Sequence, residues 1–326
     1  MKGVFYLRTF KDTELKIFEH ILSLTQEQLK HFMATFLKRH YPNVIETRDY
    51  IVAEGAIPIA LTAHLDTVFL YPPLDILYDR VKNVMIGING AGFDDRAGIF
   101  AIIKLVQSRL KPHIILTTEE ENGGLGAKAL SSKKCPFSDL RYIIQLDRRG
   151  SNDCVFYDCD NKEFIPYIES FGFTENFGSF TDISYLCPAW KIAGVNLSVG
   201  YQNEHTIQET LYVNQLFATI DKVRKMLTQP PKTSFKYIPA PKYFSPLKSY
   251  TFGLIACDSC GRQFMEEEMF PVVTQDKETV FFCPDCLVDK VSWCSRCNNA
   301  YEKYSPEEPT MGICPFCAEE KYYDKD

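Results

Sequence analysis

The chain has 326 residues, of which 45% are hydrophobic and 24% are charged, a composition that is ordinary for a soluble globular protein. No apolar run reaches the roughly 18–20 residues that a membrane span needs, and the first residues hold too short an apolar stretch for a signal peptide. We therefore expect a cytoplasmic protein that makes no membrane contact. The net charge of −6 is uneven, because residues 251–326 hold 7 basic and 15 acidic side chains.

Two amphipathic helices are predicted near the N-terminus. The second begins at Thr25, where Gln28 three residues later completes the pattern of a capping box. Tyr50–Ala53 and Ile57–Thr62 are predicted strands, and Glu54-Gly55 between them predicts a hairpin turn. Residues 70–92 are expected to form loop and short strand.

Four apolar runs end in side chains that are able to bind metal. The first, Ile59–Asp66, ends in His64 and Asp66. The others lead into Glu119-Glu120-Glu121, into Asp147 and into Asn203-Glu204-His205. Helical patterns over Ile99–Leu110 and Leu211–Leu227 alternate with these strands, which predicts an α/β fold with a mostly parallel mixed sheet and helices on both faces. Because sites gather beyond the carboxyl ends of parallel strands, the pattern predicts one metal-dependent site.

The candidate ligands are His64, Asp94, Glu121, Asp147 and His205. They offer nitrogen and oxygen donors without a thiolate, which suits a catalytic zinc pair better than a structural zinc. Five ligands suffice for two ions when one carboxylate bridges them. The alternatives are five unrelated polar residues at strand ends and a degenerate, inactive enzyme.

Three sequence blocks carry a family resemblance. They are Ala-His-Leu-Asp-Thr-Val (63–68), Gly-Phe-Asp-Asp-Arg-Ala-Gly (92–98) and Glu-Glu-Asn-Gly-Gly-Leu-Gly-Ala (120–127). With Asp147 and His205 they resemble the signature of the co-catalytic di-zinc peptidases, a clan that includes zinc aminopeptidases, zinc carboxypeptidases and aminoacylases. The resemblance spans roughly residues 10–227. It implies a zinc aminopeptidase-like fold in which Asp94 bridges two zinc ions, or Co²⁺ or Mn²⁺ in their place.

The resemblance also implies a role for each side chain around that bridge. His64 and Asp147 complete one metal site, and Glu121 and His205 complete the other. Asp66 would orient the His64 imidazole. Glu120 would be the general base, which takes a proton from a metal-bridging water and returns it to the leaving amine.

The three consecutive glutamates allow two alignments with the family pattern. Aligning Gly123 and Gly126 with the family's glycines makes Glu120 the base and Glu121 the ligand, whereas aligning from the first glutamate makes Glu119 the base and Glu120 the ligand. Asp95 is similarly ambiguous beside Asp94, and the family pattern favours the first of the two aspartates.

The expected function is a zinc-dependent hydrolase of peptide bonds, most simply an exopeptidase. The alternatives are an N-acyl amino-acid deacylase with the same chemistry and a non-catalytic zinc scaffold.

Only 57 residues separate Asp147 from His205. Larger relatives carry a lid or dimerisation domain in this part of the chain, so we expect that domain to be absent here and the site to be open. Arg148, Arg149 and Tyr201 are candidates for substrate contact, and Thr181-Asp182 resembles a supporting family block.

The sequence after residue 227 predicts a linker and a second metal module. Residues 228–250 hold five prolines, four lysines and no acid, which is typical of a linker between a catalytic domain (1–227) and residues 251–326. The last segment carries four CxxC pairs, Cys257/Cys260, Cys283/Cys286, Cys294/Cys297 and Cys314/Cys317. Eight thiolates predict two structural zinc sites, paired in sequence as a double zinc ribbon or interleaved as a cross-brace. Because the segment has a net charge of −8, a protein partner is expected and nucleic acid is not.

Overall fold

The computed structural model describes residues 8–240, 254–265, 269–274, 279–294, 300–303 and 311–313. Contacts between Cα atoms divide the chain into two compact units, Met1–Pro241 and Lys242–Asp326. Within the described ranges, no helix is both long enough and apolar enough to cross a membrane.

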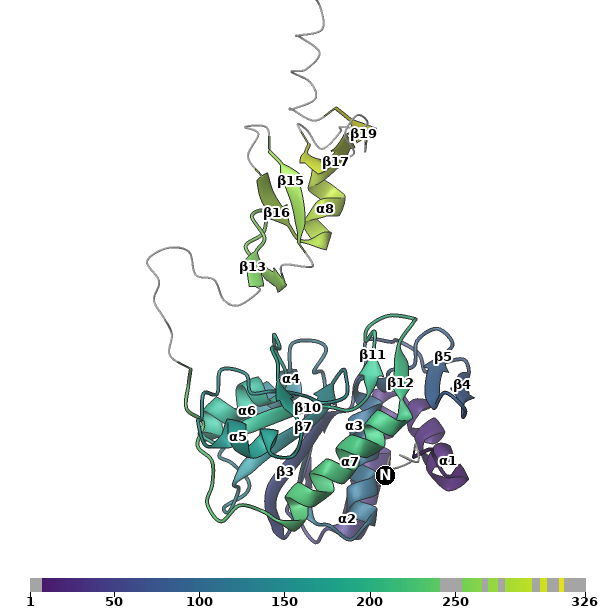
Figure 1. Cartoon of the computed structure of the whole chain (residues 1–326), viewed down its shortest axis with the longest axis vertical. Coiled ribbons are helices and arrows are strands. Elements are labelled where there is room, and N and C mark those ends of the chain that lie inside the picture. The colour runs from purple at the N-terminus through teal and green to yellow at the C-terminus, as the bar shows by residue number, and fades with distance from the viewer. Residues whose placement is uncertain are drawn as a thin grey trace, which may run out of the picture. The chain divides into compact units, whose positions relative to one another are not determined.

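An eight-stranded sheet forms the centre of the first unit (Figure 1). Its order is β1-β2-β6-β3-β7-β10-β8-β9, and its strands are β1 (Val44–Glu46), β2 (Tyr50–Ala53), β3 (Ile57–His64), β6 (Pro112–Thr117), β7 (Tyr142–Arg148), β8 (Asp153–Val155), β9 (Thr174–Glu175) and β10 (Gly194–Ser198). The central strands β6, β3, β7 and β10 run parallel. Their carboxyl ends therefore share one edge, and the predicted mixed α/β fold is confirmed.

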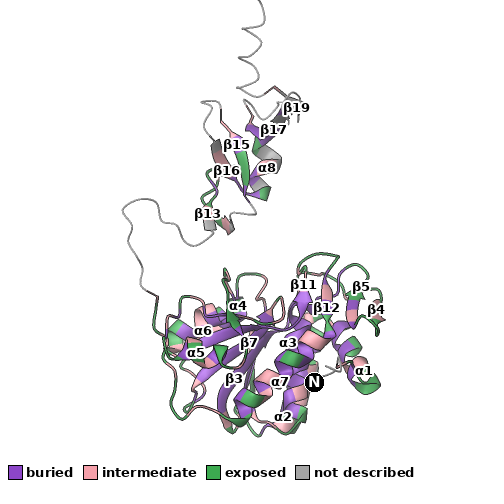
Figure 2. Cartoon of the chain, in the orientation of Figure 1, coloured by how far each residue is buried: buried purple, intermediate pink, exposed green. Residues whose placement is uncertain are grey.

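Helices cover both faces of this sheet because side chains alternate along its buried strands. In β3, Ile59 and Leu61 belong to one core cluster and Ala60 to the other. The larger cluster includes side chains of α1 (Asp12–Leu22), α2 (Gln26–His40), α3 (Phe93–Gln107), α5 (Phe164–Glu169) and α7 (Val213–Thr228). The smaller one includes α4 (Leu125–Ser131) and α6 (Ile183–Trp190). Figure 2 shows the central strands as a continuous buried layer.

The predicted start of the second helix is confirmed. Thr25 is the N-cap of α2, and its Oγ1 accepts a hydrogen bond from the Gln28 backbone N–H. The Gln28 side chain accepts one from the Thr25 N–H in return, so both halves of the capping box form.

The predicted hairpin between β2 and β3 is wrong. β6 lies between these strands, antiparallel to β2 and parallel to β3. The chain at Gly55 passes against the start of β6, where a Cβ atom would lie 2.2 Å from the Lys111 carbonyl oxygen. Gly55 is therefore required for a close backbone approach and does not form a hairpin turn.

A smaller antiparallel sheet stands beside the carboxyl edge of the large one. Its order is β11-β12-β5-β4, with strands β11 (Tyr201–Gln202), β12 (Thr210–Tyr212), β5 (Val84–Gly87) and β4 (Ile76–Asp79). The loop from β11 to β12 carries His205. Part of the segment 70–92 thus forms two strands of this sheet.

Residues 228–240 belong to the first unit and pack against its other elements. The Phe235 ring lies 4.9 Å from the ring of Phe164 and 6.0 Å from that of Tyr142, centroid to centroid. The Phe235 carbonyl accepts a hydrogen bond from the Ala193 N–H. The remainder of the predicted linker, 241–250, lies outside the described residues.

The second unit holds a small hairpin and a five-stranded sheet. The hairpin pairs β13 (Leu254–Ala256) with β14 (Gln263–Met265). The sheet has the order β16-β15-β18-β17-β19, with strands β15 (Phe270–Val273), β16 (Thr279–Phe282), β17 (Val291–Cys294), β18 (Ala300–Glu302) and β19 (Met311–Gly312), and α8 (Pro284–Lys290) follows β16. The core around Val272, Phe282 and Cys283 is small. A double zinc ribbon in this unit remains a prediction.

Candidate metal centre

Three of the predicted ligands converge at the carboxyl end of β3. Nε2 of His64 lies 3.0 Å from Oδ1 of Asp94, at the start of α3, and 3.4 Å from Oδ1 of Asp147, in β7. One donor atom from each of the three residues lies within 4.8 Å of the others. All three side chains are at least nine-tenths buried.

The other two predicted ligands form a second set with the same aspartate. Nε2 of His205 lies 3.3 Å from Oδ2 of Asp94 and 3.1 Å from Oε2 of Glu121. These three residues also place donor atoms within 4.8 Å of one another. Asp94 thus presents one carboxylate oxygen to each set, and the five side chains form one cluster.

Asp95, the neighbour of Asp94, has a different place. Its carboxylate accepts hydrogen bonds from the Gly98 N–H at 2.9 Å and from the His64 N–H at 3.3 Å. It is fully buried and belongs to neither donor set. Asp95 therefore ties the end of β3 to the first turn of α3.

Asp66 connects two parts of the cluster. Its Oδ1 lies 3.3 Å from Nδ1 of His64, the ring nitrogen that faces away from Asp94. Its Oδ2 accepts a hydrogen bond from the Glu121 N–H at 3.0 Å. A carboxylate in this position fixes the orientation of the imidazole and holds the glutamate loop against β3.

The three consecutive glutamates have distinct surroundings. The Glu119 carboxylate accepts hydrogen bonds from the side-chain amides of Gln26 at 2.8 Å and Asn122 at 2.6 Å. The Glu120 carboxylate makes no side-chain hydrogen bond within the described residues. Burial raises the pKa of Glu120 to about 9, with the charges of Asp147, Asp182 and Asp94 adding to the effect and His64 opposing it. The charges of the cluster thus act on the Glu120 carboxylate, whereas the Glu119 carboxylate faces the first turn of α2.

Asp147 is held by two hydroxyl groups. Thr181 Oγ1 donates to Oδ2 of Asp147 at 2.8 Å, and the Tyr201 hydroxyl donates to Oδ1 at 3.2 Å. Burial and the charge of Asp94 raise the pKa of Asp147 to about 7, against the effect of His64. Tyr201, a candidate for substrate contact, is buried and contacts Asp147.

The two candidate arginines beside Asp147 form ion pairs. Arg148 Nη2 lies 3.8 Å from Asp153, and Arg149 Nη1 lies 2.8 Å from Glu204 on the loop that carries His205. Asp182, which the sequence placed in a supporting role, is fully buried and accepts a hydrogen bond from the Thr117 hydroxyl.

Sequence reasoning missed Glu209. Its carboxylate is buried and accepts hydrogen bonds from the Gly92 N–H at 2.7 Å and from the Asp94 N–H at 2.9 Å. A single glutamate in a polar loop carries no spacing pattern, so its only signal was its position four residues after His205.

The donor set fits divalent cations. Asp66, Asp94 and Asp147 are at least nine-tenths buried around the His64 imidazole, and a group of buried carboxylates that is compensated only in part is costly. Oε1 of Glu121 is also buried and has no hydrogen-bond partner within the described residues. Cations between these oxygens would balance the charge and lower the raised pKa values, and the nitrogen and oxygen donors suit zinc, cobalt or manganese.

Four cysteines of the second unit also lie together. One sulfur atom from each of Cys257, Cys260, Cys283 and Cys286 lies within 4.8 Å of the others. Arg262 Nε donates to Sγ of Cys260 at 3.3 Å, which stabilises a thiolate there. These are the first two CxxC pairs in sequence order. Of the last two pairs, Cys294 is buried, and Cys297, Cys314 and Cys317 lie outside the described residues.

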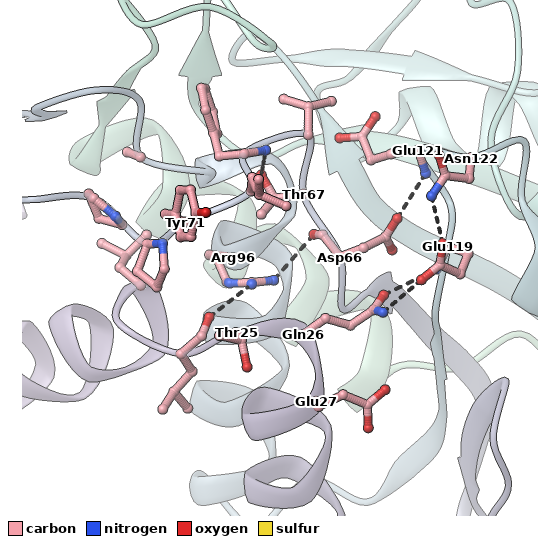
Figure 3. A pocket seen from close by; sticks show the side chains of 18 residues that line it. Thr25, Gln26, Glu27, Asp66, Thr67, Tyr71, Arg96, Glu119, Glu121 and Asn122 are labelled. Atoms are coloured by element: carbon pink, nitrogen blue, oxygen red, sulfur yellow. Dashed lines mark hydrogen bonds between the residues drawn. The ribbon is translucent and has the colours of Figure 1, made fainter.

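A pocket of about 520 Å³ adjoins the cluster (Figure 3). Glu121, one of the five cluster residues, lines it, as does Asp66, which contacts His64. Its other walls come from the first turn of α2, from the loop after β3 and from the glutamate loop.

No protein-family model matches the chain, and no curated protein matches it in sequence. Its fold is similar to that of several solved aminopeptidases. A tripeptidase from Staphylococcus aureus is 13% identical with a TM-score of 0.54, over 66% of this chain and 96% of the other. The aminopeptidase PepT from Bacillus cereus is 13% identical with a TM-score of 0.52, over 67% and 98%. A TET aminopeptidase from a marine-sediment archaeon of the Thaumarchaeota is 12% identical with a TM-score of 0.54, over 68% and 98%. At these identities the likeness shows only that the fold is shared.

Proposed function

We propose that the first unit is a two-metal hydrolase that cleaves peptide bonds as an exopeptidase. The observation that carries this proposal is the shared carboxylate of Asp94, which faces His64 and Asp147 on one side and Glu121 and His205 on the other. The similarity of the fold to solved aminopeptidases supports it.

The five cluster residues would hold two divalent cations, with Zn²⁺ favoured and Co²⁺ or Mn²⁺ as substitutes. Such a pair, when bound, polarises the scissile carbonyl and lowers the pKa of water. The chain's own part is to fix the ligands. Asp66 orients His64, Thr181 and Tyr201 orient Asp147, and Glu209 holds the backbone of Asp94.

Glu120 is the proposed general base. Its carboxylate takes a proton from the attacking water and delivers it to the leaving nitrogen. Two observations support this role over a structural one. No side-chain hydrogen bond to another described residue holds Glu120 in place, and burial, together with the charges of Asp147 and Asp94, raises its pKa. Glu119, by contrast, is engaged with Gln26 and Asn122.

A substrate screen tests this function. The full chain, loaded with Zn²⁺, Co²⁺ or Mn²⁺, is assayed against peptides and N-acyl amino acids, and Glu120→Gln is compared with Glu19→Gln, an exposed control on α1. We expect peptide hydrolysis that falls by a factor of at least about 100 in Glu120→Gln and is unchanged in the control. Hydrolysis of acyl amino acids alone would favour a deacylase. No turnover with any metal would favour the zinc scaffold.

For the second unit we propose a structural zinc site made by Cys257, Cys260, Cys283 and Cys286. The acidity of residues 251–326 favours a protein partner over a nucleic acid.

A further inference from the structure

The pocket beside the metal cluster has one apolar wall. Val68, Leu70 and Tyr71, on the loop that follows β3, line this side. Leu70 is 82% exposed and Tyr71 is 76% exposed, so these side chains have few packing partners in the described structure. An aliphatic chain that enters the pocket would cover them.

The opposite side of the pocket is acidic. Glu27 and Glu119 line it together with Glu121 and Asp66 (Figure 3). Neither Glu27 nor Glu119 forms an ion pair with a residue of the described ranges. The partners of Glu119 are neutral amides, which leave its negative charge uncompensated. Glu119 also has a φ of +56°, a backbone conformation that is uncommon outside glycine and recurs at functional sites.

Among the described residues that line the pocket, Arg96 is the one cation, and its hydrogen bonds hold it within the fold. Its guanidinium donates to the carbonyl oxygens of Leu65 at 2.6 Å, Asp66 at 3.2 Å and Leu24 at 3.2 Å. Arg96 is 2% exposed. Its charge offsets the acids only in part, and the partial positive charge at the start of α2 is offset by Glu27 in the same turn. The pocket therefore keeps a negative balance.

Glu121 has a buried carboxylate oxygen at the border between the pocket and the metal cluster. Its side chain is nine-tenths buried where it lines the pocket, and its Oε1 has no hydrogen-bond partner within the described residues. Glu121 is also one of the five residues of the cluster that holds the proposed reaction centre, and Asp66 contacts His64 of that cluster. A group bound in the pocket would thus be a neighbour of the scissile bond.

We infer that this pocket receives a basic side chain, that of lysine or arginine, on a residue next to the scissile amide. The inference rests on the proposed function and names its substrate class. The aliphatic stem of such a side chain lies along Val68, Leu70 and Tyr71, while its charged end reaches Glu119 and Glu27. Glu119 and Glu27 are then residues that determine specificity and take no part in bond cleavage.

Matched peptides test the inference. Lysine, norleucine and glutamate are placed in turn on the amino and on the carboxyl side of the scissile bond, and kcat/KM is measured with the metal-loaded full chain. We expect lysine to exceed norleucine on one of the two sides by a factor on the order of ten, and glutamate to be the poorest. High salt should reduce the preference.

Two variants test whether the acidic side of the pocket causes the preference for lysine. Glu119→Gln and Glu27→Gln should each move the lysine-to-norleucine ratio toward one, and the control Glu19→Gln should keep it. Glu27 is exposed and makes no side-chain hydrogen bond within the described residues, so its variant is expected to fold even if Glu119→Gln does not.

The outcomes separate this inference from the proposed function. Equal rates for lysine and norleucine on both sides, or a preference unchanged in both pocket variants, would overturn the basic pocket while the peptidase stands. Absence of hydrolysis for every peptide and metal would overturn the peptidase itself, and the inference with it.

Discussion

The carboxylate of Glu209 holds the backbone of Asp94. It accepts a hydrogen bond from the Asp94 N–H at 2.9 Å and a second from the Gly92 N–H at 2.7 Å. Gly92 has a φ of +66°, and a Cβ atom there would lie 2.8 Å from Oγ1 of Thr67. The turn that presents Asp94 to both donor sets thus depends on a buried acid from the β11–β12 loop.

Truncation of Glu209 should destabilise the first unit. Glu209→Ala leaves two buried N–H groups without an acceptor, and we expect a loss of about 2–5 kcal/mol in the free energy of unfolding. Glu209→Gln keeps one acceptor oxygen and should lose less. Thermal unfolding followed by circular dichroism compares the two variants, and an unchanged transition in Glu209→Ala would contradict the role given to this side chain.

The Thr181 hydroxyl should contribute to metal affinity. Thr181→Val removes the hydrogen bond to Oδ2 of Asp147 with little change of shape, and we expect metal affinity to fall about tenfold because the carboxylate is less well oriented. Competition with a chelator measures it. Thr228→Val, an exposed position at the end of α7, is the matched control. Equal metal affinities in Thr181→Val and the wild type would show that the Thr181 hydroxyl does not help Asp147 to bind metal.

The sequence allowed us to predict that side chains at the strand ends lie together, because the carboxyl ends of parallel strands share one edge of the sheet. That rule predicted that His64, Asp147 and Glu121 would lie close together, and the structure places them in one cluster. It did not predict the order β2-β6-β3, because Glu54-Gly55 is compatible with a hairpin and equally with a close backbone approach. Local turn residues do not specify which strand pairs with which.

Sequence patterns do not predict contacts between loops that are far apart in the chain. Glu209 acts on Asp94 through backbone N–H groups, which leave no trace in residue types. The contact between Gln26 and Glu119 joins residues 93 positions apart and separates Glu119 from Glu120. The run of three glutamates leaves that distinction open, because only the fold shows which carboxylate faces the cluster.

The four-cysteine cluster should bind one zinc ion. Cys260→Ser removes one donor, and we expect the zinc content of the full chain to fall by about one equivalent and the second unit to become sensitive to protease, because so small a core depends on its metal. Cys135→Ser, outside the CxxC pairs, is the control. Zinc content that matches the wild type in both variants would rule out this site.

Glu14 should make the stability of the first unit depend on acid. Its buried carboxylate lies 2.9 Å from Lys104 Nζ and accepts a hydrogen bond from the Lys11 N–H at 3.0 Å. Burial raises the pKa of Glu14, but the Lys11 N–H and the charges of Lys104 and Arg8 outweigh it, so the pKa lies below its ordinary value of 4.5.

A lowered pKa in the folded state means that Glu14 stabilises the fold fully above the unfolded pKa near 4.5, and that this contribution is lost as pH falls through the folded pKa. We expect Glu14→Gln to cost about 1–2 kcal/mol at neutral pH and less in acid. The difference in unfolding free energy between the variant and the wild type, measured across pH, checks this. A difference that stays constant into acid would refute it.

The metal content of Asp94→Asn tests the shared carboxylate most directly. Wild type and variant are loaded with Zn²⁺ and dialysed, and metal is counted on the full chain, so that zinc held by cysteines cancels in the difference. Because Asp94 faces both donor sets, we expect the variant to hold about two equivalents fewer than the wild type. A variant that loses no metal, or only one equivalent, would contradict a centre built on one bridging carboxylate.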